Sequence, residues 1–311
     1  MPENKPERIA AIVVTYNRKQ LLGECIDSLL RQTRPLDGLY IIDNASTDGT
    51  DQYLVGRGLI SSADRAIEVR YVRMSENAGG AGGFAEGMEQ ATGAGYDWLW
   101  LMDDDVLAAP DALDVLLQKK GRLEAAHSEP FILNSLVLAR DSSDGDVLAF
   151  PLRELSARGS PKMGTFHWRL SEVRDKVHDG LYRWICPFNG TFVPARAVRE
   201  VGPPRKEFFI YGDETDFQFR AAKTFRLYTA VASRVFHPRP QPGRFDWKQY
   251  YSIRNMFIVN RHFDHAALRN LRLIFVGLVM GLRHGRQGTK LMLRAIRDGL
   301  AGRLGKRDGL P

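Results

Sequence analysis

Cysteine is scarce in this sequence, and no apolar segment is long enough to cross a bilayer. The 311 residues include two cysteines, Cys25 and Cys186, far apart in the chain. Two distant cysteines form neither a disulfide framework nor the close Cys/His spacing of a zinc site, which favours a reducing cytoplasm. The longest strongly apolar run, residues 273–282, has ten residues, whereas a membrane-spanning helix needs about 20. Residues 1–8 are polar and lack the apolar stretch of a signal peptide.

Positive charge is concentrated at one end of the chain. The composition, 44% hydrophobic and 26% charged, is typical of a globular protein and excludes a disordered or collagen-like chain. The formal net charge is +7, yet residues 261–311 alone hold eleven Arg or Lys and three acids. The first 260 residues are therefore nearly neutral. The basic segment predicts an anionic partner, and the candidates are a nucleic acid, a membrane surface and a phosphorylated substrate.

The first half of the chain alternates apolar, β-branched runs with helical stripes. The predicted strands are residues 9–15, 38–43, 66–74 and 96–102, and the predicted helices are residues 21–30, 79–91 and 110–119. This order predicts an α/β fold with a parallel, doubly wound sheet. In such sheets, ligands bind beyond the carboxyl ends of the strands.

Polar side chains follow each of these predicted strands. The clusters are Tyr16-Asn17-Arg18, Asp43-Asn44, Asn77 and Asp103-Asp104-Asp105. Parallel strands end at one edge of a sheet, so the four clusters predict one ligand site. Two carboxylates about 4 Å apart repel by about 4 kcal/mol at an effective dielectric near 20, and Mg²⁺ or Mn²⁺ would relieve the repulsion within the Asp triplet. The alternative is a solvated N-cap of the helix that opens at Pro110.

A second acidic cluster lies in the other half of the chain. Asp213-Glu214-Thr215-Asp216 follows an apolar stretch, residues 208–212. An acid there is a candidate general base, because burial raises its pKa toward the working pH. The alternative is a first helical turn whose acids complement the helix dipole. His237 follows a predicted strand at residues 226–232, and it is either a further metal ligand or a structural histidine.

Three features near the predicted edge have two interpretations each. Asp43 could accept hydrogen bonds from a nucleotide base or ribose, or form an Asx-turn. Tyr16 could stack on a base, or be an ordinary half-buried aromatic. Residues 80–85 fit the dinucleotide fingerprint G-x-G-x-x-A but follow the third predicted strand rather than the first. These glycines either allow a ligand to approach the backbone or allow the helix to pack closely.

Taken together, the motifs resemble the inverting glycosyltransferases of family 2, which have the GT-A fold. The resemblance covers roughly residues 8–260. The motifs that carry it are Ile12-Val13-Val14-Thr15-Tyr16-Asn17-Arg18, Asp43-Asn44-Ala45-Ser46-Thr47-Asp48-Gly49-Thr50, Glu76-Asn77-Ala78-Gly79-Gly80, Asp103-Asp104-Asp105 and Tyr211-Gly212-Asp213-Glu214-Thr215-Asp216. The glycine run, the Asp triplet and residues 247–255 are most similar to bacterial galactofuranosyltransferases, with rhamnosyltransferases next.

The resemblance implies a role for individual residues. The residues implied in nucleotide-sugar binding are Thr15, Tyr16, Asn17, Arg18, Asp43, Asn77, Gly79, Gly80, Asp103 and Asp104. Asp103, Asp105 and His237 would bind Mn²⁺ or Mg²⁺. By position Glu214 takes the role of catalytic base. The order Asp-Glu departs from the family's Glu-Asp or Asp-Asp pair, so Asp213 stays open as the base.

These expectations define an organisation and a function. Residues 1–260 would form the GT-A domain, with a nucleotide-binding half at 8–120 and an acceptor half at 121–260, followed by a basic, amphipathic helical region at 261–311. The resemblance implies transfer of galactofuranose from a UDP-sugar donor to a lipid-linked or polysaccharide acceptor of the cell envelope. A rhamnosyltransferase using a dTDP-sugar, an NAD-dependent oxidoreductase using residues 80–85 and a nucleic-acid binder are the alternatives.

The C-terminal region adds an expectation about location. Residues 268–283 contain the ten-residue apolar run, flanked by arginines. Such a segment is typical of a helix that lies on an anionic bilayer, with its arginines at the headgroups. We therefore expect a cytoplasmic protein bound peripherally to the inner face of a bacterial plasma membrane, without a nucleic-acid partner. The alternative is a core helix or a helix that joins two copies in a homo-oligomer.

Overall fold

The computed structural model describes residues 6–60, 67–126, 128–156, 161–162, 164–185, 188–239, 245–307 and 309–310; Cys186 and residue 66 of the third predicted strand lie outside them. The strands are β1 (Ile9–Thr15), β2 (Gly38–Asp43), β3 (Glu68–Arg73), β4 (Trp98–Asp103), β5 (Leu107–Ala108), β6 (Phe131–Ala139), β7 (Val147–Leu152), β8 (His167–Arg169), β9 (Leu181–Arg183), β10 (Thr191–Pro194) and β11 (Arg226–His237). The α-helices are α1 (Lys19–Leu30), α2 (Thr50–Gly56), α3 (Gly79–Gly93), α4 (Ala112–Ala126), α5 (Ala195–Val201), α6 (Asp213–Ala221), α7 (Lys248–Val259), α8 (Ala266–Arg283) and α9 (Gly285–Leu300).

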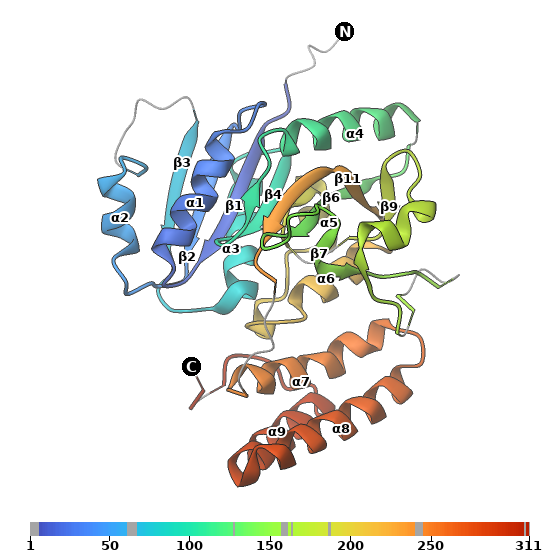
Figure 1. The fold of residues 1–311 in the computed structure, drawn as a ribbon. Helices are drawn as coiled ribbons and strands as arrows, with labels where there is room; N and C mark the ends of the chain where they lie inside the picture. Colours follow the sequence, from blue (N-terminus) through green and yellow to red (C-terminus); the bar gives the residue numbers. More distant parts are fainter. Residues whose placement is uncertain are drawn as a thin grey trace.

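One mixed sheet runs through the main body (Figure 1). Its strand order is β3-β2-β1-β4-β10-β6-β11-β5, and β1 to β4 are mutually parallel. β10 runs antiparallel to both β4 and β6, whereas β11 is parallel to β6. The predicted α/β class with a mostly parallel sheet is confirmed. The alternation of strands and helices in the first half of the chain predicted that these strands are parallel, because parallel neighbours are usually joined by a helix.

The register of the parallel strands creates the predicted edge. Thr15 at the end of β1 pairs with Asp43 at the end of β2, and Val14 pairs with Asp103 at the end of β4. All of β1 and β2 is buried, as their continuous apolar runs require in a sheet covered on both faces. The polar residues that follow these strands therefore emerge at one edge.

Two predicted boundaries fall short of the observed ones. The helix predicted at residues 110–119 corresponds to α4, which extends to Ala126. The strand predicted at residues 226–232 corresponds to β11, which continues to His237. A register shift between Ala230 and Arg234 interrupts the pairing of β11 with β6. Such a bulge breaks the side-chain alternation from which a strand is predicted, so the second half of β11 was missed.

The glycine-rich run forms the start of α3, which packs on the sheet. A Cβ atom on Gly83 would lie 2.4 Å from Val14 Cγ1, and one on Gly87 would lie 2.5 Å from Ile12 Cγ2. Close approach of α3 to β1 therefore requires these glycines. The helix follows β3, so residues 80–85 do not form the turn after the first strand that a dinucleotide fingerprint needs.

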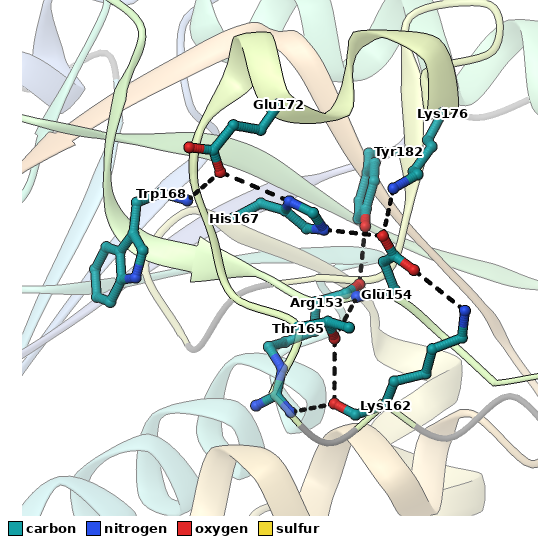
Figure 2. A network of polar contacts seen from close by, with 9 residues as sticks. All are labelled: Arg153, Glu154, Lys162, Thr165, His167, Trp168, Glu172, Lys176 and Tyr182. Carbon is teal, nitrogen blue, oxygen red and sulfur yellow. Dashed lines mark hydrogen bonds and ion pairs between the residues drawn. The ribbon is translucent and has the colours of Figure 1, made fainter.

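Three further strands extend the sheet: β7 pairs with β6 and β8, and β9 pairs with β11. Glu154, which follows β7, is part of the polar network drawn in Figure 2. Its carboxylate accepts hydrogen bonds from Lys162 Nζ at 3.2 Å and from Lys176 Nζ, and it lies 3.1 Å from His167 Nε2. The hydrogen bond from Lys176, followed by that from Lys162, lowers the pKa of Glu154 to about 2. The indole ring of Trp168 points away from this network, and half of its surface is exposed.

Helices α7, α8 and α9 form a layer below the sheet in Figure 1, on the side of the carboxyl ends of β1 to β4. Together with Phe209 from the loop before α6, they form an apolar cluster separate from the main core, which also contains Tyr250, Tyr251, Ile253, Phe257, Met292, Ala295 and Ile296. The predicted helical C-terminal extension is present, and its layer includes α7, whose residues precede 261. Among the described residues, every helix is too short or too polar to span a bilayer.

Candidate active site

Two carboxylates and an imidazole converge at the edge of the sheet. Asp103 ends β4, Asp105 follows it and His237 ends β11, and one potential ligand atom from each lies within 4.8 Å of the other two. His237 Nδ1 pairs with the carbonyl oxygen of Pro238. This contact directs Nε2 toward Asp105 Oδ1, 3.2 Å away. A backbone partner on one ring nitrogen is the arrangement that orients a histidine for metal binding through the other.

The donor set of this cluster fits a divalent cation. Asp105 Oδ1 is buried and makes no hydrogen bond of good geometry. Burial, followed by the negative charge of Asp105, raises the pKa of Asp103 to about 7. Burial also opposes ionisation of Asp105, but the close approach of His237 Nε2 and the charge of that ring outweigh it and hold the pKa of the carboxyl below its usual range. Carboxylates with one imidazole suit Mn²⁺ or Mg²⁺, and a cation would remove the repulsion that raises the pKa of Asp103.

The middle acid of the triplet points elsewhere. Asp104 accepts a hydrogen bond from Thr15 Oγ1 at 2.7 Å and one from Arg18 Nη1 at 3.2 Å. Burial raises the pKa of Asp104 to about 6, while the positive charge of Arg18 opposes the increase. The same Arg18 nitrogen lies 3.0 Å from Asp105 Oδ2. Thr15 and Asp104, both predicted to bind the donor, thus hold Arg18 beside Asp105 of the candidate metal site.

Asp43 is buried at the end of β2 inside a hydrogen-bond network. Its Oδ2 accepts a 2.5 Å hydrogen bond from the Tyr71 hydroxyl and lies 3.4 Å from Arg73 Nη1. Its Oδ1 accepts from the backbone N–H of Ser46 at 2.8 Å, a local contact that holds the turn after β2. Sequence reasoning missed Tyr71 and Arg73, although their spacing in a strand places them on one face and Arg73 pairs with Asp43.

The other predicted donor-binding residues line the same edge. Tyr16 is 43% exposed. Asn17 has a positive φ of 54°, and its Oδ1 accepts from the Thr47 N–H at 2.7 Å. This contact joins the loop after β1 to the loop after β2. Asn77 Oδ1 accepts a hydrogen bond from the N–H of Gly79, the first residue of α3, at 2.8 Å. A Cβ on Gly80 would meet nothing within 4 Å.

The acidic pair opens α6. Asp213 is 4% exposed, whereas Glu214 is partly exposed. Burial, followed by the charge of Glu214 and a hydrogen bond to it, raises the pKa of Asp213 well above its usual range. Asp103 adds a smaller contribution to this increase, and the charge of Glu214 in turn contributes to the raised pKa of Asp103. The acidic pair and the Asp triplet are therefore near enough to interact electrostatically.

The third acid of this helix has a structural partner set. Asp216 is buried and lies 3.0 Å from Arg205 Nη2, 2.8 Å from Arg220 Nε and 2.9 Å from His262 Nε2. Burial opposes ionisation, but the hydrogen bonds from His262 and Arg220 outweigh it and keep the pKa of Asp216 low. Asp216 therefore anchors α6 and leaves Asp213 and Glu214 as the acids available for chemistry.

Comparison with known sequences places this site in a family. The sequence profile described as Glycosyl transferase family 2 matches residues 10–128. The galactofuranosyltransferase GlfT1 of Mycobacterium tuberculosis (strain CDC 1551 / Oshkosh) is 35% identical over 236 residues, which cover 75% of this chain and 70% of that protein. GlfT1 of Mycolicibacterium smegmatis is 32% identical over 240 residues, covering 75% of this chain and 71% of that protein.

Solved structures share the fold at low sequence identity. GalNAc-T7 with UDP, GalNAc and Mn²⁺ has a TM-score of 0.60 at 14% identity, over 96% of this chain and 57% of that chain. TarS 1-349 of S. aureus with UDP-GlcNAc has a TM-score of 0.57 at 13% identity, over 94% and 80% of the two chains. The predicted GT-A fold is confirmed. The chain is a glycosyltransferase and belongs to glycosyl transferase family 2.

Proposed function

We propose that this glycosyltransferase moves galactofuranose from UDP-galactofuranose, with inversion, onto a lipid-linked or polysaccharide acceptor in cell-envelope glycan synthesis. The observation that carries the reaction type is the convergence of Asp103, Asp105 and His237, together with the electrostatic interaction between Asp103 and the Asp213–Glu214 pair. The identity of 35% with a galactofuranosyltransferase over 75% of this chain supports the sugar. Direct displacement inverts the anomeric carbon and needs no protein nucleophile.

The donor would bind along the edge of the sheet. Asp103, Asp105 and His237 would hold Mn²⁺ or Mg²⁺, which neutralises charge on the leaving nucleoside diphosphate. Tyr16 has the exposed face needed to stack on uracil, and Asp43 is a buried acceptor at the end of the neighbouring strand β2. The guanidinium of Arg18, fixed by Asp104 and half-exposed, offers a further positive group to the diphosphate.

Glu214 is the favoured base. Burial raises the pKa of Asp213 well above its usual range, which favours its protonated form, and the two acids share a hydrogen bond. Glu214 is the more accessible acid of the pair, so its carboxylate is the one that an acceptor hydroxyl can reach. The two acids thus differ in role because they differ in burial.

Helix α8 supports a membrane location. Five of its exposed apolar residues are spaced by three or four positions and form one stripe: Leu268, Leu271, Phe275, Leu278 and Leu282. The surrounding region is basic. An apolar stripe with basic flanks matches a helix that lies at an anionic membrane surface, and such contact would bring a lipid-linked acceptor to the enzyme on the inner face of the plasma membrane.

Donor and location can be tested separately. The purified chain is incubated with UDP-galactofuranose, UDP-galactose, UDP-GlcNAc or dTDP-rhamnose, with Mn²⁺ or with EDTA, and nucleotide release and transfer are measured. Metal-dependent turnover of UDP-galactofuranose alone is expected; turnover of dTDP-rhamnose instead would replace the proposed donor. Flotation with phosphatidylglycerol vesicles is expected, whereas a dimer that does not float would assign the α8 stripe to a second copy.

A further inference from the structure

The loop before the acidic pair has an unusual backbone. Phe209, Tyr211 and Gly212 all have positive φ angles, of 69°, 63° and 87°. Residues with side chains rarely adopt this region, and such a conformation is strained unless the surrounding structure imposes it. Gly212 is the N-cap of α6, so this loop sets where Asp213 and Glu214 begin.

Four consecutive carbonyl groups of the loop are held by hydrogen bonds. The side-chain nitrogen of Asn255 donates to the carbonyl oxygens of Phe208, Ile210 and Tyr211, at 3.0, 2.8 and 2.8 Å. Arg254 Nη2 donates to Phe208 as well, at 3.0 Å. The remaining carbonyl, that of Phe209, accepts from the backbone N–H of Ala81 at 3.1 Å. An amide group has two N–H bonds, so Asn255 shares them among three acceptors.

The Arg254-Asn255 pair is itself buried and fixed. Asn255 is 0% exposed and Arg254 is 1% exposed. Arg254 Nε donates to Asn255 Oδ1 at 2.8 Å, which orients the amide so that its nitrogen faces the loop. The guanidinium also lies 4.8 Å from the ring centroid of Tyr251. A buried guanidinium hydrogen-bonded to carbonyls and an amide is expensive to desolvate, so its position points to a requirement for this loop geometry.

The segment at residues 303–307 returns from α9 to the same loop. Arg254 Nη1 donates to the Gly305 carbonyl, and the Gly305 N–H donates to the Glu207 carbonyl, both at 2.6 Å. The Arg307 N–H donates to the Tyr251 hydroxyl at 2.9 Å. Lys306 Nζ lies 5.6 Å from the centroid of the Phe209 ring and donates to the Asn77 carbonyl at 3.3 Å.

The loop is thus held from two sides. On the donor side, Gly79 allows α3 to approach so closely that a Cβ on it would lie 2.0 Å from the Phe209 carbonyl oxygen. On the opposite side, α7 and residues 303–307 supply Arg254, Asn255 and their partners. The donor-binding edge and the acidic pair are therefore joined through one strained loop.

We propose that Arg254 and Asn255, supported by residues 303–307, are positioning residues that set the acidic pair relative to the donor. The inference rests on the proposed base role of Glu214. With this role, the C-terminal helical layer supports the active site in addition to providing the surface proposed for membrane contact. We call the contacts that Arg254, Asn255 and residues 303–307 make with this loop the clamp. Loss of the clamp moves Glu214 and leaves the donor site at the strand ends intact.

The test compares Asn255→Ala with Asn260→Ala in the full chain. Asn260 is buried on the same side of the molecule, but its amide donates to Asn270, so it is a matched control. For Asn255→Ala, kcat is expected to fall by about 10- to 100-fold, since misplacing a catalytic group by about 1 Å costs up to about 100-fold. KM for the donor and the affinity for UDP stay within about twofold, and the control keeps its kcat. An unchanged kcat for Asn255→Ala, or a rise in KM alone, would overturn the proposal.

Hydrogen exchange keeps the clamp testable independently of the donor. The amides of residues 206–214 are expected to exchange faster in Asn255→Ala than in the wild type, while those of β1 and β2 are unchanged; equal exchange in the loop overturns the clamp. If the wild type turns over no tested sugar, the proposed donor is wrong, and hydrogen exchange alone tests whether the clamp holds the loop.

Tyr251→Phe removes one hydroxyl and leaves the ring, so it replaces Asn255→Ala as the test variant if Asn255→Ala does not fold. It is expected to lower kcat by about two- to fivefold, the effect of one hydrogen bond, and an unchanged kcat counts against the proposal.

Discussion

The donor-side half, residues 8–120, and the C-terminal helical layer, α7 to α9, build their parts of the site in different ways. In the donor-side half, buried parallel strands end at one edge, and the side chains proposed to bind the donor lie at or just after the ends of these strands. In the helical layer, a helix distant in sequence and a returning segment hold a strained loop by its carbonyl groups. The first region brings its side chains together by the order of its strands, and the second positions the acidic pair by long-range packing. Substitutions in the two regions should therefore have different effects on donor binding and on kcat.

The largest effect should come from the donor-side half. Asp105→Asn removes one charge from the cluster with Asp103 and His237 and is expected to lower metal-dependent transfer by at least about 1,000-fold, because a bound metal contributes several kcal/mol to the transition state. Calorimetric titration with Mn²⁺ should show weakened binding. Asp111→Asn, an exposed acid at the start of α4, is the control. Retained transfer in Asp105→Asn, with unchanged Mn²⁺ binding, would remove the cluster from the mechanism.

The next effect lies on the other side of the comparison. Glu214→Gln keeps the shape of the side chain and removes its basicity, so kcat is expected to fall by about 100- to 10,000-fold. Binding of UDP with Mn²⁺ should be unchanged, because the donor site belongs to the strand ends. Steady-state kinetics and UDP titration measure the two quantities. If Asp213→Asn abolishes transfer while Glu214→Gln retains it, the roles assigned to the two acids are reversed.

The same comparison explains how far the sequence was informative. The edge with Asp43, Asp103 and Asp105 could be predicted because strand periodicity and the carboxyl-end rule are local properties of the chain. The direction of Asp104 could not, because adjacent residues at the end of a strand differ only in which neighbours they meet. Asn255 lies in the stretch 247–255 that contributed to the resemblance, but nothing local in the sequence indicated its role, because a polar residue in a helix is ordinary until the carbonyls it contacts are known.

A smaller effect is expected at the surface of the helical layer. Leu271 is 64% exposed in the α8 stripe, and Leu271→Glu places a negative charge where the bilayer would lie. Vesicle binding is expected to weaken by about tenfold, from the lost burial of one leucine and charge repulsion. Turnover of a water-soluble acceptor should stay unchanged. Point variants are preferable to truncation, because removal of residues 303–307 would also disturb the loop that carries the base. Equal flotation of variant and wild type would exclude α8 as the contact.

The smallest expected effect is a stability change with a definite sign. The pKa of Asp213 is raised in the folded state, so the folded protein binds this proton more tightly than the unfolded chain, and stability is lost as the pH rises toward the folded pKa. Asp213→Asn removes this ionisation. Thermal unfolding of the metal-free protein should therefore show a higher Tm for the variant at pH 8, with a difference that shrinks as the pH falls toward the pKa of an unfolded aspartate, about 4. A constant difference across this range would mean that burial of Asp213 is not what separates the two acids, and the assignment of Glu214 as the base would lose its physical reason.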